Sequence, residues 1–201
     1  MSVRRERKDA IEHRRLILQT AQSLFDEHGV HSVSMHQIAK TAGIGQATLY
    51  RRYAHKGDLC AELMEDYCQQ LIENITAYLQ INVKLSPAER LGGIISAWID
   101  ALEEKSEMIV TMEARMDCDD PRGNFFHSDM YLTIRSQIAE LLSEMIGPNP
   151  PTPIDTTLTA HALICSMAPP GYFHLKHEMA YTREQIKQSY LHMCQLTAQR
   201  S

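Results

Sequence analysis

The stretch from Ser34 to Leu59 constrains this chain more than any other, because it predicts two short helices joined by a glycine turn. Ser34 lies three residues before Gln37, the spacing at which a capping serine and a side-chain amide each bond the other's backbone N–H. Gly43 is expected to end the first helix, because glycine enters the left-handed backbone region without steric cost. The second helix is expected over residues 46–53. This order predicts a helix-turn-helix, whose second helix enters the major groove of DNA.

The second of these helices carries side chains suited to contact with DNA. Gln46 and Arg51 are expected to read base edges, because glutamine and arginine make paired hydrogen bonds to purines. Thr48 and Tyr50 are expected to reach phosphates through their hydroxyls. Lys56 stands just before a longer fourth helix, where it and the first free N–H groups are expected to hold a phosphate. The residues predicted to contact DNA are Ser34, Gln46, Ala47, Thr48, Tyr50, Arg51, Arg52 and Lys56.

The charge of the chain is unevenly distributed, in agreement with this site. Residues 1–56 contain 10 Lys and Arg against 5 Asp and Glu, whereas residues 57–201 contain 10 against 20. A basic first quarter on an acidic remainder is typical of a small nucleic-acid-binding head on a body that repels DNA. Residues 1–8 are expected to form either a frayed tail or an arm along the phosphates.

Apolar residues recur at helical spacing through most of the chain, and no convincing strand pattern interrupts them. The predicted fold is therefore all-α with about nine helices. Beyond the two short helices, they are expected at about residues 9–28, 56–82, 86–105, 106–116, 126–146, 154–168 and 183–198. The sequences Ser86-Pro87-Ala88-Glu89 and Thr182-x-x-Gln185 are capping signals for two of them. After the Pro169-Pro170-Gly171 interruption, a helical extension to about Glu178 is expected.

Four short patterns fall in register between about Arg15 and Leu63. They read Ala21-x-x-Leu24-Phe25-x-x-x-Gly29, Ile38-Ala39-x-x-Ala42-Gly43-Ile44, Thr48-Leu49-Tyr50-x-x-Tyr53 and Lys56-x-x-Leu59. In these residues the chain closely resembles the TetR family of bacterial transcriptional regulators. The resemblance implies a three-helix DNA-binding domain over residues 1–55. It also implies a helical domain over residues 56–201 that binds an effector and dimerises.

Eleven methionines include Met108, Met112 and Met116, which follow one another at i+4 steps along one helix face. Such a stripe can be plain core, or it can form the floor of an adaptable pocket, because methionine is flexible and polarizable. The resemblance favours a pocket, since TetR-like proteins usually hold a small-molecule effector within the C-terminal helices. The residues predicted to line it are Tyr78, Trp98, Met108, Met112, Met116, Phe126, Tyr131 and Ile134.

The resemblance also implies a homodimer that binds a palindromic operator in double-stranded DNA. Two heads are needed because one short helix contacts too few base pairs. The interface is expected on the last two long helices, and an effector bound in the body is expected to release a repressor from its operator. The residues predicted at the interface are Leu158, Ala162, Cys165, Ile186, Tyr190 and Met193.

Two alternatives to an effector-responsive regulator remain open on the sequence. One is a small-molecule-binding or catalytic α-helical protein with a vestigial helix-turn-helix, against which the basic head argues. The other is a DNA-binding regulator without a small-molecule ligand. The sequence contains no GxSxG, HExxH, Walker loop or GxGxxG, so no catalytic residue and no cofactor is predicted.

Two histidine pairs have the spacing of metal ligands on a helix. His161 lies four residues before Cys165, and His174 lies three before His177. Neither pair has further ligands nearby in the sequence, so structural roles are expected and no metal is predicted. The five cysteines form no CxxC and are expected to be reduced.

The location of the protein is predicted from two further features of the sequence. No apolar run approaches the roughly 18 residues that a membrane span requires. The charged N-terminus lacks the apolar core of a signal peptide. The chain is therefore expected in the cytoplasm, with no membrane partner.

Overall fold

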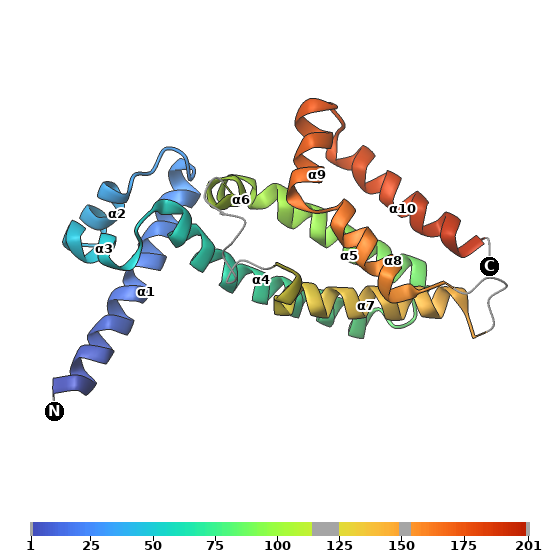
Figure 1. Cartoon of the computed structure of the whole chain (residues 1–201), viewed down its shortest axis with the longest axis horizontal. Helices are drawn as coiled ribbons and strands as arrows, with labels where there is room; N and C mark the ends of the chain where they lie inside the picture. Colours follow the sequence, from blue (N-terminus) through green and yellow to red (C-terminus); the bar gives the residue numbers. More distant parts are fainter. Residues whose placement is uncertain (1, 114–124, 149–153, 200–201) are drawn as a thin grey trace. The chain divides into compact units, whose positions relative to one another are not determined.

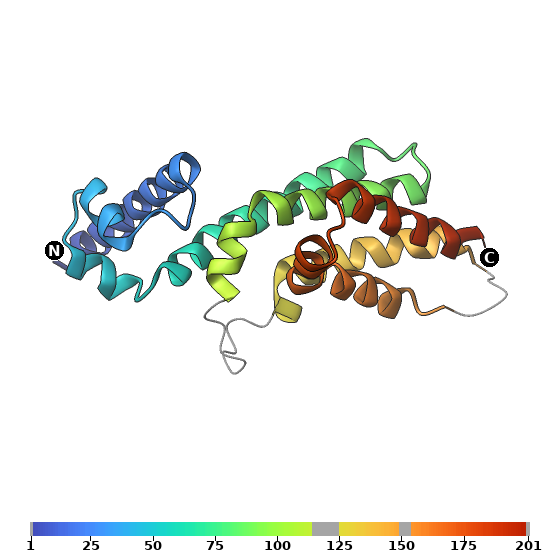
Figure 2. The ribbon, with the colours of Figure 1, turned by 90° about the horizontal axis from the view of Figure 1, so that it is seen from above.

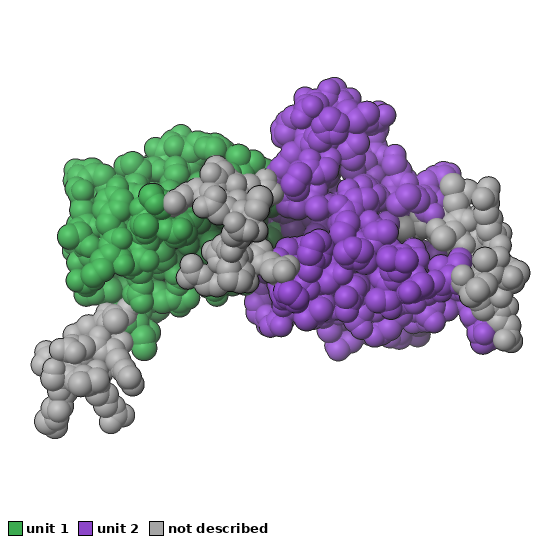
Figure 3. Space-filling model, in the orientation of Figure 1, with its two compact units in different colours: residues 1–67, 105–120 green, residues 68–104, 121–201 purple. Residues whose placement is uncertain are grey.

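The computed structural model describes residues 2–113, 125–148 and 154–199, and within these ranges it contains helices and no strand. The prediction of an all-α fold is confirmed. The chain divides into two compact units (Figure 3). Unit 1 comprises residues 1–67 and 105–120, and unit 2 comprises residues 68–104 and 121–201. The predicted functional division at residue 55 stays a prediction.

Unit 1 is built from α1 (Ser2–His28), α2 (Met35–Thr41), α3 (Gln46–Arg52), the first part of α4 (Lys56–Ile81) and α6 (Ser106–Glu113). Figure 1 shows the short helices α2 and α3 beside α1. Helix α1 begins at Ser2, earlier than the expected start at about Asp9. The core of this unit contains Ile17, Leu18, Ala21, Leu24, Phe25, Val30, Val33, Met35, Ile38, Ala39, Leu49, Tyr53, Leu59, Cys60, Leu63 and Met108.

The local signals that were predicted to shape the helix-turn-helix are present in unit 1. Ser34 caps α2, and its Oγ accepts a hydrogen bond of 3.1 Å from the backbone N–H of Gln37. Gly43 follows α2 with φ of +67°, the left-handed conformation that ends the helix at little cost. Leu49, which is fully buried, anchors α3 in the core.

Unit 2 holds the rest of α4 with α5 (Pro87–Glu104), η2 (Phe125–His127), α7 (Asp129–Ile146), α8 (Thr156–Ser166), α9 (Pro169–Phe173), η3 (His174–Glu178) and α10 (Arg183–Gln199). Helix α5 packs against both α7 and α10, and α7 runs beside α8 (Figure 2). The predicted apolar stripes of α5 and α7 face this core. Its members include Leu91, Ile95, Trp98, Ile134, Ile138 and Leu141.

The segment around the double proline forms a separate helix, so the described residues contain ten α-helices where about nine were expected. Helix α8 ends at Ser166, and Ala168 adopts an extended conformation as the N-cap of α9. Pro169 and Pro170 then occupy the first turn, where a missing N–H costs nothing. The chain continues through η3 to Glu178, as the expected extension.

Both predicted capping boxes are confirmed. The Ser86 N–H donates to the Glu89 carboxylate at 2.9 Å, and the Glu89 N–H donates back to Ser86 Oγ at 3.3 Å. Thr182 and Gln185 make the same reciprocal pair at 2.8 and 3.2 Å. Among the described helices, none is both long and apolar enough to cross a membrane.

Candidate nucleic-acid interface

Helix α3 presents most of the residues predicted to contact DNA on its outer surface. Gln46, Ala47, Arg51 and Arg52 are exposed, and Tyr50 is 47% exposed. Leu49 is the buried residue of this seven-residue helix, and most of the side chains around it remain exposed. Thr48 is half-buried, and Ser34 is exposed at the cap of α2. The exposed surface thus combines side chains that can pair with bases and side chains that can reach phosphates.

Gln46 at the start of α3 contacts His36, which is not among the residues predicted to contact DNA. Its Nε2 is within hydrogen-bonding distance of Nδ1 of His36, an exposed residue on α2. The two residues are ten apart in the sequence and come together because the glycine turn folds α3 back beside α2. No local motif marks this pair, and only the helix phases of α2 and α3 together could have suggested it.

Lys56, which is predicted to hold a phosphate, contacts the backbone of the loop between α1 and α2. Its Nζ donates to the carbonyl oxygens of Val30 at 2.6 Å, Val33 at 3.0 Å and His31 at 3.4 Å. An ammonium group has three donors, so these carbonyls use all of them. Lys56 thus fastens the loop between α1 and α2 onto the start of α4, and its contact with a phosphate stays a prediction.

The same loop is held from another side by Glu107 on α6. Glu107 Oε2 accepts hydrogen bonds from the backbone N–H of Val30 at 2.6 Å and of His31 at 3.4 Å. Gly29, with φ of +78°, begins the loop, and a Cβ there would lie 3.2 Å from the same carboxylate oxygen. The peptide group between Val30 and His31 is therefore held at both ends. Its carbonyl accepts from the Lys56 ammonium, and its N–H donates to the Glu107 carboxylate. This arrangement fixes the loop that leads into α2.

Replacing Lys56 by methionine should lower the free energy of unfolding of unit 1 by about 2 kcal/mol, because charge-assisted hydrogen bonds are lost and carbonyls are left without a donor. Chemical denaturation followed by circular dichroism measures this loss. Lys40→Met, at an exposed position of α2, is the matched control and should cost little. Equal stability of the two variants, together with a salt dependence of DNA binding flattened only by Lys56→Met, would support the phosphate role.

The aromatic residues predicted to line an effector pocket lie in unit 2, where they pack on one another. Trp98 is buried and donates from Nε1 to the carbonyl of Met167 at 3.1 Å. The Phe126 ring lies 5.2 Å from Tyr131 and 5.5 Å from His161 between centroids. Ile134 is fully buried. Tyr78, Trp98, Phe126, Tyr131 and Ile134 thus belong to one unit, and their use by a ligand stays a prediction.

Tyr78 is half-buried against α5. Its hydroxyl donates to the carbonyl of Glu89 at 3.3 Å. A Cβ on Gly93 would come within 2.4 Å of the tyrosine ring, so glycine is what allows α4 and α5 to approach here. The Tyr78 side chain therefore has a packing role of its own.

The methionine stripe belongs to the other unit. Met108 is part of the core of unit 1, and Met112 packs against the same core. Their side chains complete the hydrophobic core of unit 1, and their use by a ligand stays a prediction. Met116 lies outside the described residues.

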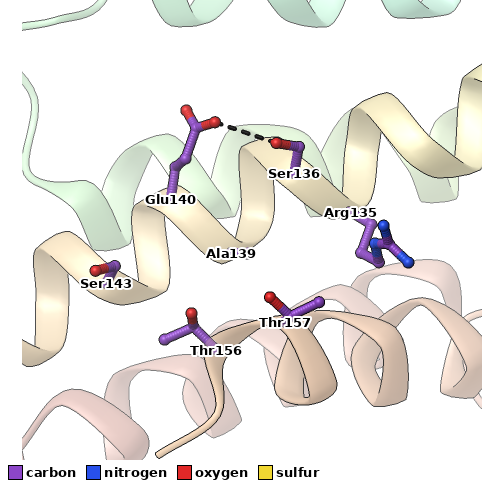
Figure 4. A pocket seen from close by; sticks show the side chains of 7 residues that line it. All are labelled: Arg135, Ser136, Ala139, Glu140, Ser143, Thr156 and Thr157. Carbon is purple, nitrogen blue, oxygen red and sulfur yellow. Dashed lines mark hydrogen bonds between the residues drawn. The ribbon is translucent and has the colours of Figure 1, made fainter.

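Two surface hollows occur in the described residues. One, of about 270 Å³, lies between α7 and the start of α8 and is lined by Arg135, Ser136, Ala139, Glu140, Ser143, Thr156 and Thr157 (Figure 4). The other, of about 630 Å³, is in unit 1 and is lined by Leu18, Gln19, Gln22, Ser23, Leu63, Asp66, Tyr67, Lys105 and Met108. Of the residues predicted to bind an effector, Met108 alone lines either of these two hollows.

His161 is a half-buried side chain tied to its neighbours. Its Nδ1 is 2.7 Å from the Tyr131 hydroxyl, and Cys165 Sγ is 3.5 Å from its Nε2. No group of three or more potential metal ligands occurs within the described ranges.

Cys60 is a buried thiol in unit 1. Burial raises its pKa to about 11, which keeps the thiol protonated near neutral pH.

The residues predicted at the dimer interface differ in their exposure. Leu158 is 62% exposed and Met193 is 47% exposed. Ala162, on α8, is also exposed. Tyr190 is half-buried and donates to the carbonyl of Ser166 at 2.7 Å. Cys165 is half-buried beside His161. Ile186, at 3% exposure, is buried in the core of its own chain, so its assignment to the interface is corrected.

Comparison with known proteins finds similarity in the N-terminal part of this chain. Residues 17–63 match the bacterial regulatory proteins of the tetR family. A helix-turn-helix-type transcriptional regulator of Staphylococcus aureus strain bovine RF122 / ET3-1 is 48% identical over 75 residues, which are 37% of this chain and 39% of that protein. A regulator of the same type from strain USA300 is 56% identical over 54 residues, 27% of this chain and 29% of its own. The matched stretches thus span less than half of these curated relatives.

Solved structures with the same fold extend over nearly the whole chain. A transcriptional regulator from Saccharomonospora viridis in complex with choline has a TM-score of 0.64 and 21% identity, covering 89% of this chain and 93% of its own. Thermus thermophilus FadR in complex with lauroyl-CoA has a TM-score of 0.62 and 15% identity, covering 90% and 92%. At these identities the similarity establishes the fold.

Proposed function

We infer that this chain is a member of the tetR family of bacterial regulatory proteins and is a transcriptional regulator that binds DNA through α3. The observation that carries this inference is the outward face of α3. Gln46, Tyr50 and Arg51 are exposed there while Leu49 fixes the helix in the core. A short helix anchored in this way can enter the major groove without losing its packing.

We propose further that the regulator acts as a homodimer on a palindromic operator. Leu158 and Ala162 lie one turn apart on the exposed side of α8, and Met193 is exposed on α10. Exposed apolar side chains on these two helices support a protein–protein interface. Two heads related by a two-fold axis would read half-sites separated by about one helical turn, 34–36 Å, or a multiple of it.

We also propose that a small-molecule effector binds in unit 2 and weakens DNA binding. Both structural neighbours described above were solved with small molecules, one with choline and one with lauroyl-CoA. By linkage, an effector weakens operator binding only as far as it prefers the conformer that binds DNA poorly, typically by about 1–3 kcal/mol. The protein would then act as a repressor in the cytoplasm, released when the effector accumulates.

Arg51→Ala tests the reading of bases by α3. The wild-type protein is first used to select its operator from random duplex DNA, and affinities are then measured on every single-base variant. The substitution should cost about 1–3 kcal/mol and relax the preference at particular base pairs. Arg135→Ala, which removes the same charge from unit 2, is the matched control and should leave base preference unchanged. An Arg51→Ala variant that weakens all duplexes equally would assign Arg51 to the phosphates instead.

A further inference from the structure

The pair formed by His36 and Gln46 bears on which base the protein reads. Gln46 is the first residue of α3, and His36 lies on α2 beside it. The Nε2 amide nitrogen of Gln46 contacts Nδ1 of His36, and both side chains are exposed. The contact therefore orients a side chain at the surface that is proposed to face DNA.

The chemistry of this contact fixes the hydrogen-bonding face of the glutamine amide. The amide has two N–H donors and one carbonyl oxygen, and its nitrogen accepts no hydrogen bond. The bond to His36 is therefore donated by Gln46, and Nδ1 accepts it. His36 then carries its ring proton on Nε2. One N–H and the carbonyl oxygen Oε1 of Gln46 remain available to a partner.

One donor beside one acceptor is the complement of adenine in the major groove. Adenine presents N7 as an acceptor and its N6 amino group as a donor, whereas guanine presents two acceptors, N7 and O6. An amide with one N–H already used can satisfy the adenine edge with both of its remaining groups. With guanine, its Oε1 would face the O6 oxygen without a proton between them.

We propose that His36 is a positioning residue that directs Gln46 to adenine. The proposal rests on the DNA-binding function inferred above and deepens it by naming a determinant of sequence preference. His36 acts through Gln46 and needs no contact with a base of its own. A histidine on the first helix of the motif thereby sets which base the second helix accepts.

The test measures the binding of full-length protein to duplexes derived from the selected operator, with each of the four bases placed in turn at every half-site position. Gln46→Ala first identifies the position whose preference depends on this glutamine. The wild-type protein should prefer adenine there. His36→Ala should reduce the preference for adenine over guanine at that same position by about fivefold, the lower end of what a paired contact contributes. The double variant should behave as Gln46→Ala alone.

Two further variants sharpen the test. His36→Lys places a group that can only donate next to Gln46, so it should hold Oε1, free the amide hydrogens and move the preference towards guanine. Thr41→Ala, at another exposed position of α2, is the control and should leave every preference unchanged. Thermal melting monitored by circular dichroism checks that each variant remains folded.

Several results would overturn the assignment. The Gln46-dependent position could prefer a base other than adenine. His36→Ala could weaken all four duplexes by one common factor, or its effect could add in full to that of Gln46→Ala. Each of these leaves DNA binding by α3 intact, whereas a wild-type protein without any sequence preference would overturn the proposed function itself.

Discussion

Ala162→Glu is expected to convert the protein from a homodimer into monomers or aggregates. Ala162 lies on the exposed side of α8, one turn from Leu158. In the proposed dimer a glutamate there places a carboxylate in an apolar interface without a partner. Because an unpaired buried charge costs several kcal/mol, the dimer dissociation constant should rise by at least about 100-fold. Sedimentation equilibrium over a range of protein concentrations measures the constant directly.

Ala77→Glu provides the matched control for this substitution. Ala77 is an exposed alanine within the long helix α4, so the same change of charge and size should leave association unaltered. Because a palindromic operator needs both heads, Ala162→Glu should also weaken operator binding while Ala77→Glu does not. A wild-type protein that sediments as a monomer at micromolar concentration would contradict both the dimer and the palindrome.

Trp98→Ala should destabilise unit 2 by about 3–5 kcal/mol, the usual cost of deleting a large aromatic side chain from a packed core. Trp98 is 4% exposed, and its indole N–H donates to the carbonyl of Met167 at 3.1 Å. The substitution therefore leaves a cavity and an acceptor without its donor. Urea unfolding followed by far-ultraviolet circular dichroism measures the loss of stability. Tryptophan fluorescence cannot be used, because the substitution removes the single tryptophan of the chain.

Trp98→Phe separates the two parts of this cost. Phenylalanine keeps much of the aromatic volume and removes the N–H, so a smaller loss of about 1–2 kcal/mol is expected. If Trp98→Ala instead cost less than about 1 kcal/mol and altered only the response to an effector, the residue would line a cavity, as the sequence first suggested.

The helix-turn-helix could be predicted because its determinants are local. The Ser34 cap, the glycine at residue 43 and the buried Leu49 each act within a few residues of their own position. The capping boxes at Ser86 and Thr182 were predictable for the same reason. The phase of α3 then followed, because a helix anchored by one buried leucine has a single outward face.

The parts that the sequence did not indicate depend on contacts between distant residues. Glu107 holds the loop at Val30 across 77 positions of sequence, and no motif marks a carboxylate that binds two backbone amides. The carbonyls that occupy Lys56 are likewise supplied by a loop more than twenty residues earlier. A methionine stripe is the same pattern whether it faces a ligand or a core, so Met108 could be placed only by the structure.

The affinity of the wild-type protein for its selected palindrome, compared with a scrambled duplex of the same length and composition, tests the central claim most directly. Titration by fluorescence anisotropy near physiological salt should give binding to the palindrome at least about 1,000-fold tighter, the usual margin of specific over non-specific recognition. Equal affinities for the two duplexes would contradict the assignment of α3 as a helix that reads DNA sequence.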